Sequence, residues 1–154
     1  MSIKVKAIFI SSGHDFYGRN GQDRMDHGIQ TVDTVECVAG KGLIGDRFFD
    51  YKDNYKGQVT FFDEAVFEDI KKAFSKPELE PSVFRRNVIL SGANLNSMIG
   101  QPFSIQGIEF EGTEEAKPCY WMNEAVAEGA EQALRGRGGL RARIINDGVL
   151  QVEK

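Results

Sequence analysis

The 154-residue sequence contains few of the features that mark specialised classes of protein. It has two cysteines, Cys37 and Cys119, which are too few for a disulfide framework. No apolar run approaches the roughly 20 residues that cross a membrane, and residues 1–6 follow a strand-like pattern without signal-peptide features. The formal net charge of −4 argues against a surface that coats nucleic acid or anionic lipid. We therefore expect a protein of the reducing cytoplasm that engages no membrane.

Glycine, in contrast, is abundant, with 17 residues that suggest many tight turns and a β-rich fold. The length fits a single domain over residues 1–154. The 103–110 segment should form a hairpin, and Asp147-Gly148 should join the last two strands as another. Apolar alternation and β-branched residues together predict strands at 3–9, 31–38, 58–62, 87–90, 103–110, 140–145 and 149–152.

Helical spacing of apolar residues predicts two amphipathic helices. The first covers residues 63–75 with Asp63 as its N-cap, and the second runs from a cap at Asn123 to about Arg135. Strands thus outnumber helices, and tight turns join several of them. We expect a mainly β fold with some α, in the form of a partly irregular β-barrel or sandwich with about two helices packed outside it.

The segment Gly40-Lys41-Gly42-Leu43-Ile44-Gly45 has the G-x-G-x-x-G spacing of dinucleotide-binding loops. Such a loop must lead directly into a helix, because the pyrophosphate sits on the helix N-terminus. Residues 46–51 show no helical periodicity, and the alternating strand–helix order of such folds is missing. We therefore expect a β-turn connection at 40–45, and no bound NAD(P) or FAD.

The same segment opens a resemblance to a known family. Residues 42–47, Gly-Leu-Ile-Gly-Asp-Arg, resemble the GLxGDR signature of MOSC domains, the C-terminal domains of molybdenum cofactor sulfurases, which also occur as small standalone proteins. The ordered set of motifs spans about residues 32–150 and implies an irregular β-barrel of the MOSC type. Further segments resemble the family in the same order: Gln58-Val59-Thr60, Phe84-Arg85-Arg86-Asn87-Val88, Pro118-Cys119 and Gly139-Leu140-Arg141-Ala142-Arg143-Ile144.

The resemblance implies two possible roles for Cys119. It would either carry persulfide sulfur as a nucleophile or ligate molybdenum, while arginines hold the pterin phosphate of the molybdenum cofactor. The ligand would be molybdopterin or another phosphorylated small molecule, and a cysteine desulfurase or a redox partner would be the protein partner. Two enzymatic roles stay open, a sulfur transferase and a component of a molybdenum-dependent reductase. Pyridoxal phosphate binding is taken from the family alone. The sequence holds no desulfurase domain, so the activities of the larger relatives do not transfer directly.

The residues around Cys119 give a physical reason to single it out. Lys117 lies two positions before it, Pro118 stiffens the approach, and a predicted helix begins shortly after it. These features favour the thiolate, so we expect an accessible thiol with a lowered pKa in a cleft. Without the resemblance, a buried structural cysteine would be the better interpretation. Cys37, within a predicted strand beside Glu36, is interpreted as core packing.

Basic residues gather in an otherwise acidic chain. Four arginines lie between residues 135 and 143 with no acidic residue among them, and Arg85-Arg86 form a second group. Guanidinium groups match phosphate oxygens with paired hydrogen bonds, so some of these residues should converge on one anion cavity near Cys119. A solvated strand face with surface ion pairs explains the charges equally well from the residues alone. The candidate cofactor-binding residues are Arg47, Arg86, Asn87, Arg141 and Arg143.

Other interpretations remain at this point. His14 and His27 do not form a metal pair by spacing, and no H-E-x-x-H or C-x-x-C motif occurs. The chain could be a non-catalytic module for a phosphorylated small molecule or RNA, or a scaffold whose family site has decayed. Apart from Phe84, no aromatic residue is interleaved with the basic clusters in sequence, so nucleic acid is the less favoured partner.

Overall fold

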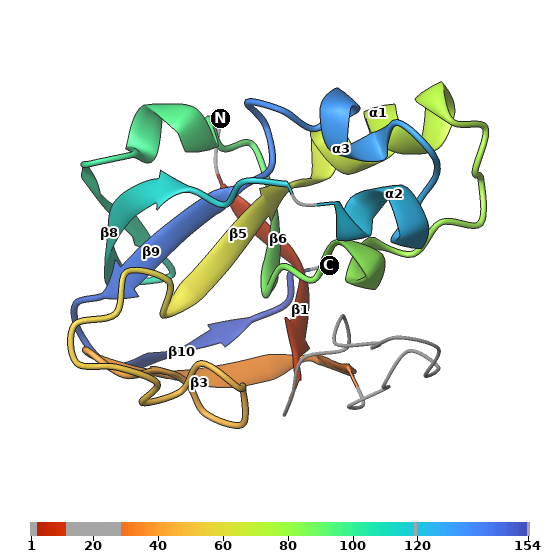
Figure 1. The fold of residues 1–154 in the computed structure, drawn as a ribbon. Helices are drawn as coiled ribbons and strands as arrows, with labels where there is room; N and C mark the ends of the chain where they lie inside the picture. The colour runs from red at the N-terminus through yellow and green to blue at the C-terminus, as the bar shows by residue number, and fades with distance from the viewer. Residues whose placement is uncertain (1–2, 12–28, 119, 154) are drawn as a thin grey trace.

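The computed structural model describes residues 3–11, 29–118 and 120–153. The predictions for Cys119, His14 and His27 therefore concern positions outside the described residues. A mixed seven-stranded sheet forms the centre of the fold (Figure 1). Its order is β2 (Gln30–Val32), β1 (Lys4–Ile10), β6 (Val88–Ser91), β5 (Val59–Asp63), β9 (Leu140–Ile144), β8 (Ile108–Glu115) and β7 (Pro102–Ile105).

Two layers cover the faces of this sheet. A small sheet lies on one face, and the helices lie on the other (Figure 1). The small sheet has the order β10 (Gly148–Gln151), β3 (Thr34–Val38) and β4 (Gly42–Leu43). The helices are α1 (Glu64–Ala73), α2 (Trp121–Ala125) and α3 (Ala130–Ala133), with short 3₁₀ turns at η1 (Pro81–Phe84) and η2 (Leu95–Met98).

Alternation along the central strands divides the apolar core into two parts, because successive side chains point to opposite faces. Phe61 of β5 packs toward the small sheet with Cys37 and Leu150, whereas Phe62 packs toward the helices with Phe84 and Ile70. All of these side chains are buried. The sequence prediction that Cys37 packs in the core is confirmed, since its exposed fraction is 1%.

The predicted mainly β fold is confirmed, but the predicted barrel is not. Within the described part of the chain, β2 and β7 lie at opposite ends of the strand order and no pairing closes the sheet. The physical reason is that β3 and β10 pair with each other as a separate layer instead of extending the large sheet. The arrangement is closer to the sandwich that the sequence left as the alternative.

The local helix predictions had different outcomes. The first helix is confirmed as α1, and the carboxylate of Asp63 accepts a hydrogen bond of 2.9 Å from the Ala65 N–H as its N-cap. The single helix predicted from Asn123 to Arg135 is wrong, because two short helices occupy that stretch. Gly129 lies between them with a φ of 92°, which ends the helical path.

The hairpin over β7 and β8 is confirmed, with positive φ at both Gln106 and Gly107, as a type I′ turn requires. The hairpin predicted at Asp147-Gly148 is wrong, because β10 pairs with β3 and not with β9. The Asp147 carboxylate accepts a hydrogen bond of 2.8 Å from the Ala39 N–H. This contact directs the chain into the second sheet.

The glycine-rich segment is a turn connection, as predicted. Gly40 adopts a φ of 73°, and Gly42 pairs with Val38 as β4 begins. Turns, and no helix, follow over residues 46–51. The geometry that a dinucleotide loop needs is therefore missing at this motif. None of the described helices is long and apolar enough to cross a membrane.

Candidate functional site

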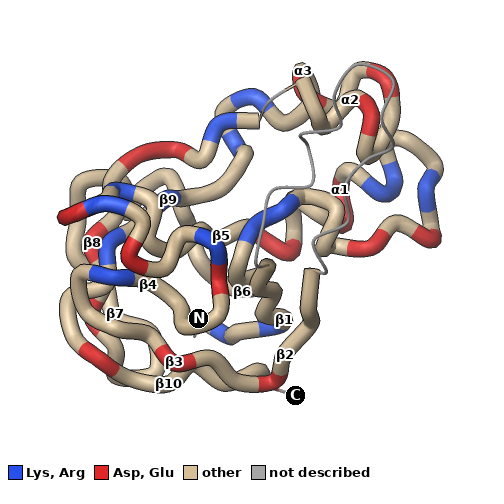
Figure 2. The backbone as a smooth tube through the Cα atoms, turned by 60° about the horizontal axis from the view of Figure 1, so that its bottom comes forward, with Lys and Arg blue, Asp and Glu red and all other residues tan. Residues whose placement is uncertain are grey.

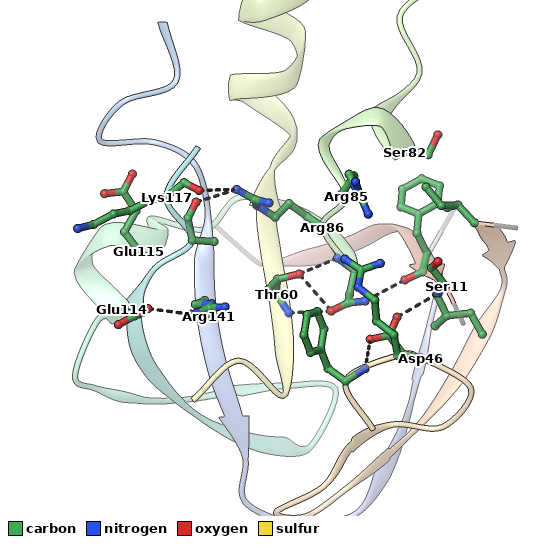
Figure 3. A pocket seen from close by; sticks show the side chains of 17 residues that line it. Ser11, Asp46, Thr60, Ser82, Arg85, Arg86, Glu114, Glu115, Lys117 and Arg141 are labelled. Atoms are coloured by element: carbon green, nitrogen blue, oxygen red, sulfur yellow. Dashed lines mark hydrogen bonds and ion pairs between the residues drawn. The ribbon is translucent and has the colours of Figure 1, made fainter. Parts of the chain in front are cut away.

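One cavity of about 410 Å³ collects most of the candidate residues (Figure 3). That volume lies in the range of small-molecule sites. Its walls come from the end of β1, the turns after β4, the η1–β6 junction, the end of β8 and the middle of β9. The lining residues include Ser11, Asp46, Arg47, Phe48, Thr60, Arg85, Arg86, Asn87, Glu114, Glu115, Lys117 and Arg141.

The cavity has a local excess of positive charge. Acidic and basic residues are interspersed along the rest of the backbone (Figure 2), and the chain carries a net charge of −4. Among the described residues, five basic side chains line the cavity against three acidic ones. Such an excess in an acidic protein favours an anionic ligand at this place. The basic residues are Arg47, Arg85, Arg86, Lys117 and Arg141, and the acidic ones are Asp46, Glu114 and Glu115.

Arg141 is held at the edge of the cavity by two side chains. Its Nη1 atom lies 2.9 Å from Oε2 of Glu114, and its Nη2 atom donates a hydrogen bond of 3.1 Å to the Tyr55 hydroxyl. Glu114 also pairs with Lys56 at 3.0 Å. The hydrogen bonds from Lys56 and Arg141 lower the pKa of the Glu114 carboxyl, so it stays ionised near neutral pH.

Arg86 reaches across the cavity wall and donates to backbone carbonyl groups. Its Nε donates to the Gly138 oxygen at 2.8 Å, its Nη1 to Phe84 at 3.1 Å and its Nη2 to Ala116 at 2.8 Å. A longer contact of 3.4 Å joins Nη2 to the Lys117 oxygen. These bonds link three separate segments that form the wall.

Asn87 ties the floor of the cavity together. Its Nδ2 donates to the Phe9 oxygen at 3.1 Å, and its Oδ1 accepts from the Thr60 N–H at 3.0 Å and from the Thr60 hydroxyl at 3.1 Å (Figure 3). The side chain is 8% exposed. Its amide therefore fixes β1 against β5.

Asp46 and Arg47 enter the cavity on the turns after β4. The buried Asp46 carboxylate accepts from the Ser11 N–H at 3.0 Å and from the Phe48 N–H at 3.3 Å. Burial raises the pKa of the Asp46 carboxyl, and the Ser11 N–H and the Arg47 charge oppose that shift. The Arg47 N–H donates to the Ser11 oxygen at 2.7 Å, which joins this turn to β1.

The structure does not bring Arg143 into the cavity with the other candidates. Two residues along β9 from Arg141, it lies on the same face but roughly 6–7 Å further along the strand. Its Nη1 atom lies 3.1 Å from Oε1 of Glu111, and its Nε donates to the Asn54 oxygen at 3.1 Å. The expected convergence therefore covers Arg47, Arg86 and Arg141, but not Arg143.

Arg85 lines the cavity although the sequence-based candidates included only its neighbour Arg86. Its three guanidinium nitrogens are buried, and its Cζ lies 5.4 Å from the centre of the Trp121 ring. Arg85 adopts a φ of 60°, which is uncommon for a residue with a side chain. The adjacent arginines were the only sequence signal for this position, because the backbone conformation that separates their directions is not visible in the sequence.

Aromatic rings and cations alternate at the rim of the cavity. Phe48 and Tyr55 stack at 5.6 Å, and Tyr51 packs edge-on against both rings. Arg47 lies over Phe48 at 4.9 Å, and Arg141 lies over Tyr55 at 5.7 Å. The turns at 46–56 thus fold aromatic rings against arginines that are distant in the sequence, although no ring other than Phe84 is interleaved with the basic clusters along the chain.

Family comparison agrees with the ordered motifs. The sequence model of the MOSC domain matches residues 40–154. The chain belongs to the MOSC domain family. A comparison with curated proteins finds no match.

Solved structures share the fold of this MOSC protein. The YuaD protein from Bacillus subtilis has a TM-score of 0.77 at 16% identity, covering 99% of this chain and 92% of YuaD. YiiM from Geobacillus stearothermophilus has a TM-score of 0.70 at 14% identity, with coverages of 97% and 71%. YiiM from Escherichia coli has a TM-score of 0.66 at 15% identity, with coverages of 96% and 65%. At these identities the likeness shows the fold alone.

The donor set suits an oxyanion better than a bare metal ion. No group of three or more His, Cys, Asp or Glu side chains that could hold a metal occurs in the described ranges. The guanidinium and ammonium groups of the cavity supply N–H donors for phosphate oxygens. A phosphorylated organic cofactor therefore fits the residues present, and the candidate sulfur ligand, Cys119, lies outside the described residues.

Proposed function

We propose that this MOSC protein binds the phosphorylated pterin of the molybdenum cofactor in the cavity. The observation that carries the proposal is the group of five basic side chains that the described residues place around a cavity of about 410 Å³, in a chain of net charge −4. Family membership supports the same ligand class, because MOSC domains are linked to the molybdenum cofactor.

The basic residues would have different tasks. Arg47, Lys117 and Arg141 would hold the phosphate, since guanidinium forks and an ammonium group bind its oxygens. Arg141 would exchange its contact with Glu114 for the stronger charge of the phosphate. Asn87 would keep the floor in shape through its bonds to Phe9 and Thr60.

Cys119 would supply the sulfur of the site. It follows Lys117 and Pro118 in sequence, and both Ala116 and Lys117 line the cavity. The bound cofactor would contribute a redox-active molybdenum, for which a thiolate is a suitable soft ligand. A persulfide on the same sulfur would instead make the protein a sulfur carrier, supplied by a cysteine desulfurase.

The direct test is to measure molybdenum and pterin in protein purified from a host that makes the cofactor. We expect both in the wild type, with a loss of molybdenum in Cys119→Ser and a loss of pterin in Arg141→Ala. Arg143→Ala is the matched control, because Arg143 lies on the same strand outside the cavity. Wild-type protein that carries neither molybdenum nor pterin, and binds no added phosphorylated pterin, would reject the proposal.

The aromatic rim favours a second candidate, a binding module for nucleotides or single-stranded RNA. Aromatic rings beside cations are the usual platform for stacked bases, and Tyr51 is 51% exposed at this rim. Affinity for a short RNA would fall steeply with salt, whereas binding of a single phosphorylated ring would fall much less. A flat salt response, or no binding of RNA, would remove this candidate.

A further inference from the structure

We infer that Arg86 is a positioning residue of this site, which holds the Ala116–Lys117 segment in the cavity wall and does not bind the ligand itself. The inference rests on the proposed function for its meaning, because it assigns a task within that site. It separates two neighbouring arginines that look equivalent in the sequence.

The hydrogen bonds of Arg86 support this assignment. A guanidinium group has five N–H donors in a rigid plane. Four contacts from this group go to the backbone oxygens of Phe84, Gly138, Ala116 and Lys117. Figure 3 shows the side chain extended toward the Lys117 segment, away from Arg85. A group used in this way has little capacity left for a phosphate.

The surrounding backbone fits closely around this contact. The Ala116 N–H donates to the Gly139 oxygen at 2.9 Å, so the two segments touch directly. A Cβ atom added at Gly138 would collide with the Ala116 carbonyl oxygen, and one added at Gly139 would collide with the Phe61 carbonyl oxygen. A Cβ at Gly139 would also lie 3.4 Å from Nε of Arg86. Arg86 therefore bridges segments that approach at backbone distance.

The consequence for the site concerns Lys117. Its side chain is exposed and lines the cavity, and two of the carbonyl groups that Arg86 binds belong to Lys117 and the residue before it. Without that hold, the backbone of Ala116 and Lys117, which carries the Lys117 side chain and leads to Cys119, would lose its fixed position. Arg86 thus acts on the ligand through Lys117.

The experiment compares Arg86→Lys with Arg86→Gln in the full chain. A ligand-binding role needs the charge, which lysine keeps, whereas a positioning role needs a planar fork that spans several carbonyl groups. We expect both variants to bind inorganic phosphate about tenfold more weakly, by analogy with the residues that orient the ligands of metal sites. Both should also raise the pH midpoint of thiol labelling at Cys119. Arg47→Lys and Arg47→Gln are the contrast, and there the lysine variant should bind better.

A second variant keeps every charge and still displaces the wall. Gly138→Ala would push against the Ala116 carbonyl oxygen with Arg86 intact, so it should weaken phosphate binding and raise the labelling midpoint as Arg86→Lys does. Arg137→Lys, an arginine that also donates to a backbone oxygen but lies outside this cavity, should change neither. Continued protection of the buried Cys37 thiol from the probe shows that each variant is folded.

The results distinguish a positioning role of Arg86 from a ligand contact. Wild-type phosphate affinity in Arg86→Lys together with weak binding in Arg86→Gln would make Arg86 a ligand contact and overturn the inference. An unchanged labelling midpoint in folded Arg86→Lys would also overturn it. If Arg86→Lys exposes Cys37, Gly138→Ala decides, and wild-type behaviour there rejects the positioning role. Absence of phosphate binding in the wild type would reject the proposed function, and the labelling midpoint would still test Arg86.

Discussion

Glu114 and Arg141 face each other across β8 and β9, with Oε2 and Nη1 2.9 Å apart at the edge of the cavity. Glu114 therefore acts as an internal anion that occupies one of the arginines proposed to bind phosphate. Its second partner, Lys56, keeps it ionised and stabilises the pair. A ligand must compete with this carboxylate for Arg141.

Glu114→Gln should therefore tighten the binding of inorganic phosphate. Removal of one negative charge near the anion is worth at most about 1 kcal/mol in a solvated environment, which corresponds to a gain of roughly two- to fivefold. A phosphate titration followed by NMR measures it. Glu111→Gln is the matched control, because its partner, Arg143, lies outside the cavity. Equal or weaker affinity in Glu114→Gln would show that Arg141 does not meet the anion.

Asn87→Ala should destabilise the protein rather than only weaken the site. The substitution removes three side-chain hydrogen bonds and leaves Thr60 and Phe9 groups without these partners in a buried region. We expect the free energy of unfolding to fall by about 2–4 kcal/mol in urea denaturation. Asn96→Ala, at an exposed position with one bond to the Gly136 oxygen, should cost less than about 1 kcal/mol. Similar losses in the two variants would contradict the structural role of Asn87.

Local signals were sufficient to predict several elements of this fold. Asp63 with the apolar spacing after it identified α1, and Gln106-Gly107 identified the β7–β8 hairpin, because each signal and its partner lie within a few residues. The pairing of β10 with β3 joins Gly148 to Cys37, far apart in sequence. No local pattern distinguishes that pairing from a hairpin at Asp147. The sequence therefore favoured a closed barrel, whereas the structure has two separate sheets.

The site was predictable in composition but not in the task of each residue. The motifs identified Arg47, Arg86 and Arg141, which do line one cavity. Arg143 shares the face of β9 with Arg141, but two residues of an extended strand place their side chains roughly 6–7 Å apart. The acceptors of Arg86 are backbone carbonyl groups at Phe84, Ala116 and Gly138. Every residue has such a group, so the sequence does not indicate which of them Arg86 contacts.

Asp46 should give the stability of the protein a characteristic pH dependence. Burial raises the folded pKa of its carboxyl above the ordinary value of 3.8, so the folded state binds the proton more tightly than the unfolded state. That contribution is fully present below the unfolded pKa and is lost as pH rises through the folded pKa. The stability of the wild type minus that of Asp46→Asn should therefore fall as pH rises from about 4.

Denaturation by urea at a series of pH values measures this difference. Asp50→Asn is the control, because its carboxylate is exposed and its pairing with Lys41 is a surface contact of 3.7 Å. Asp50→Asn separates the effect of burying the carboxyl from that of the aspartate-to-asparagine change itself. A difference for Asp46 that rises with pH would mean that its hydrogen bonds from Ser11 and Phe48 outweigh its burial.

The two cysteines should differ in reactivity toward a thiol probe. Burial raises the pKa of the Cys37 thiol to about 12, and its side chain is 1% exposed, so it should resist labelling at neutral pH. Cys119 should react much faster, because the proposed function needs an accessible thiolate and Lys117 supplies positive charge two residues away. Lys117→Gln should then raise the pH midpoint of Cys119 labelling and leave Cys37 unreactive. Mass spectrometry of the labelled peptides separates the two sites. Equal protection of both thiols, or an unchanged midpoint in Lys117→Gln, would mean that the charge of the cavity wall does not act on Cys119, and the proposed sulfur chemistry would lose its physical basis.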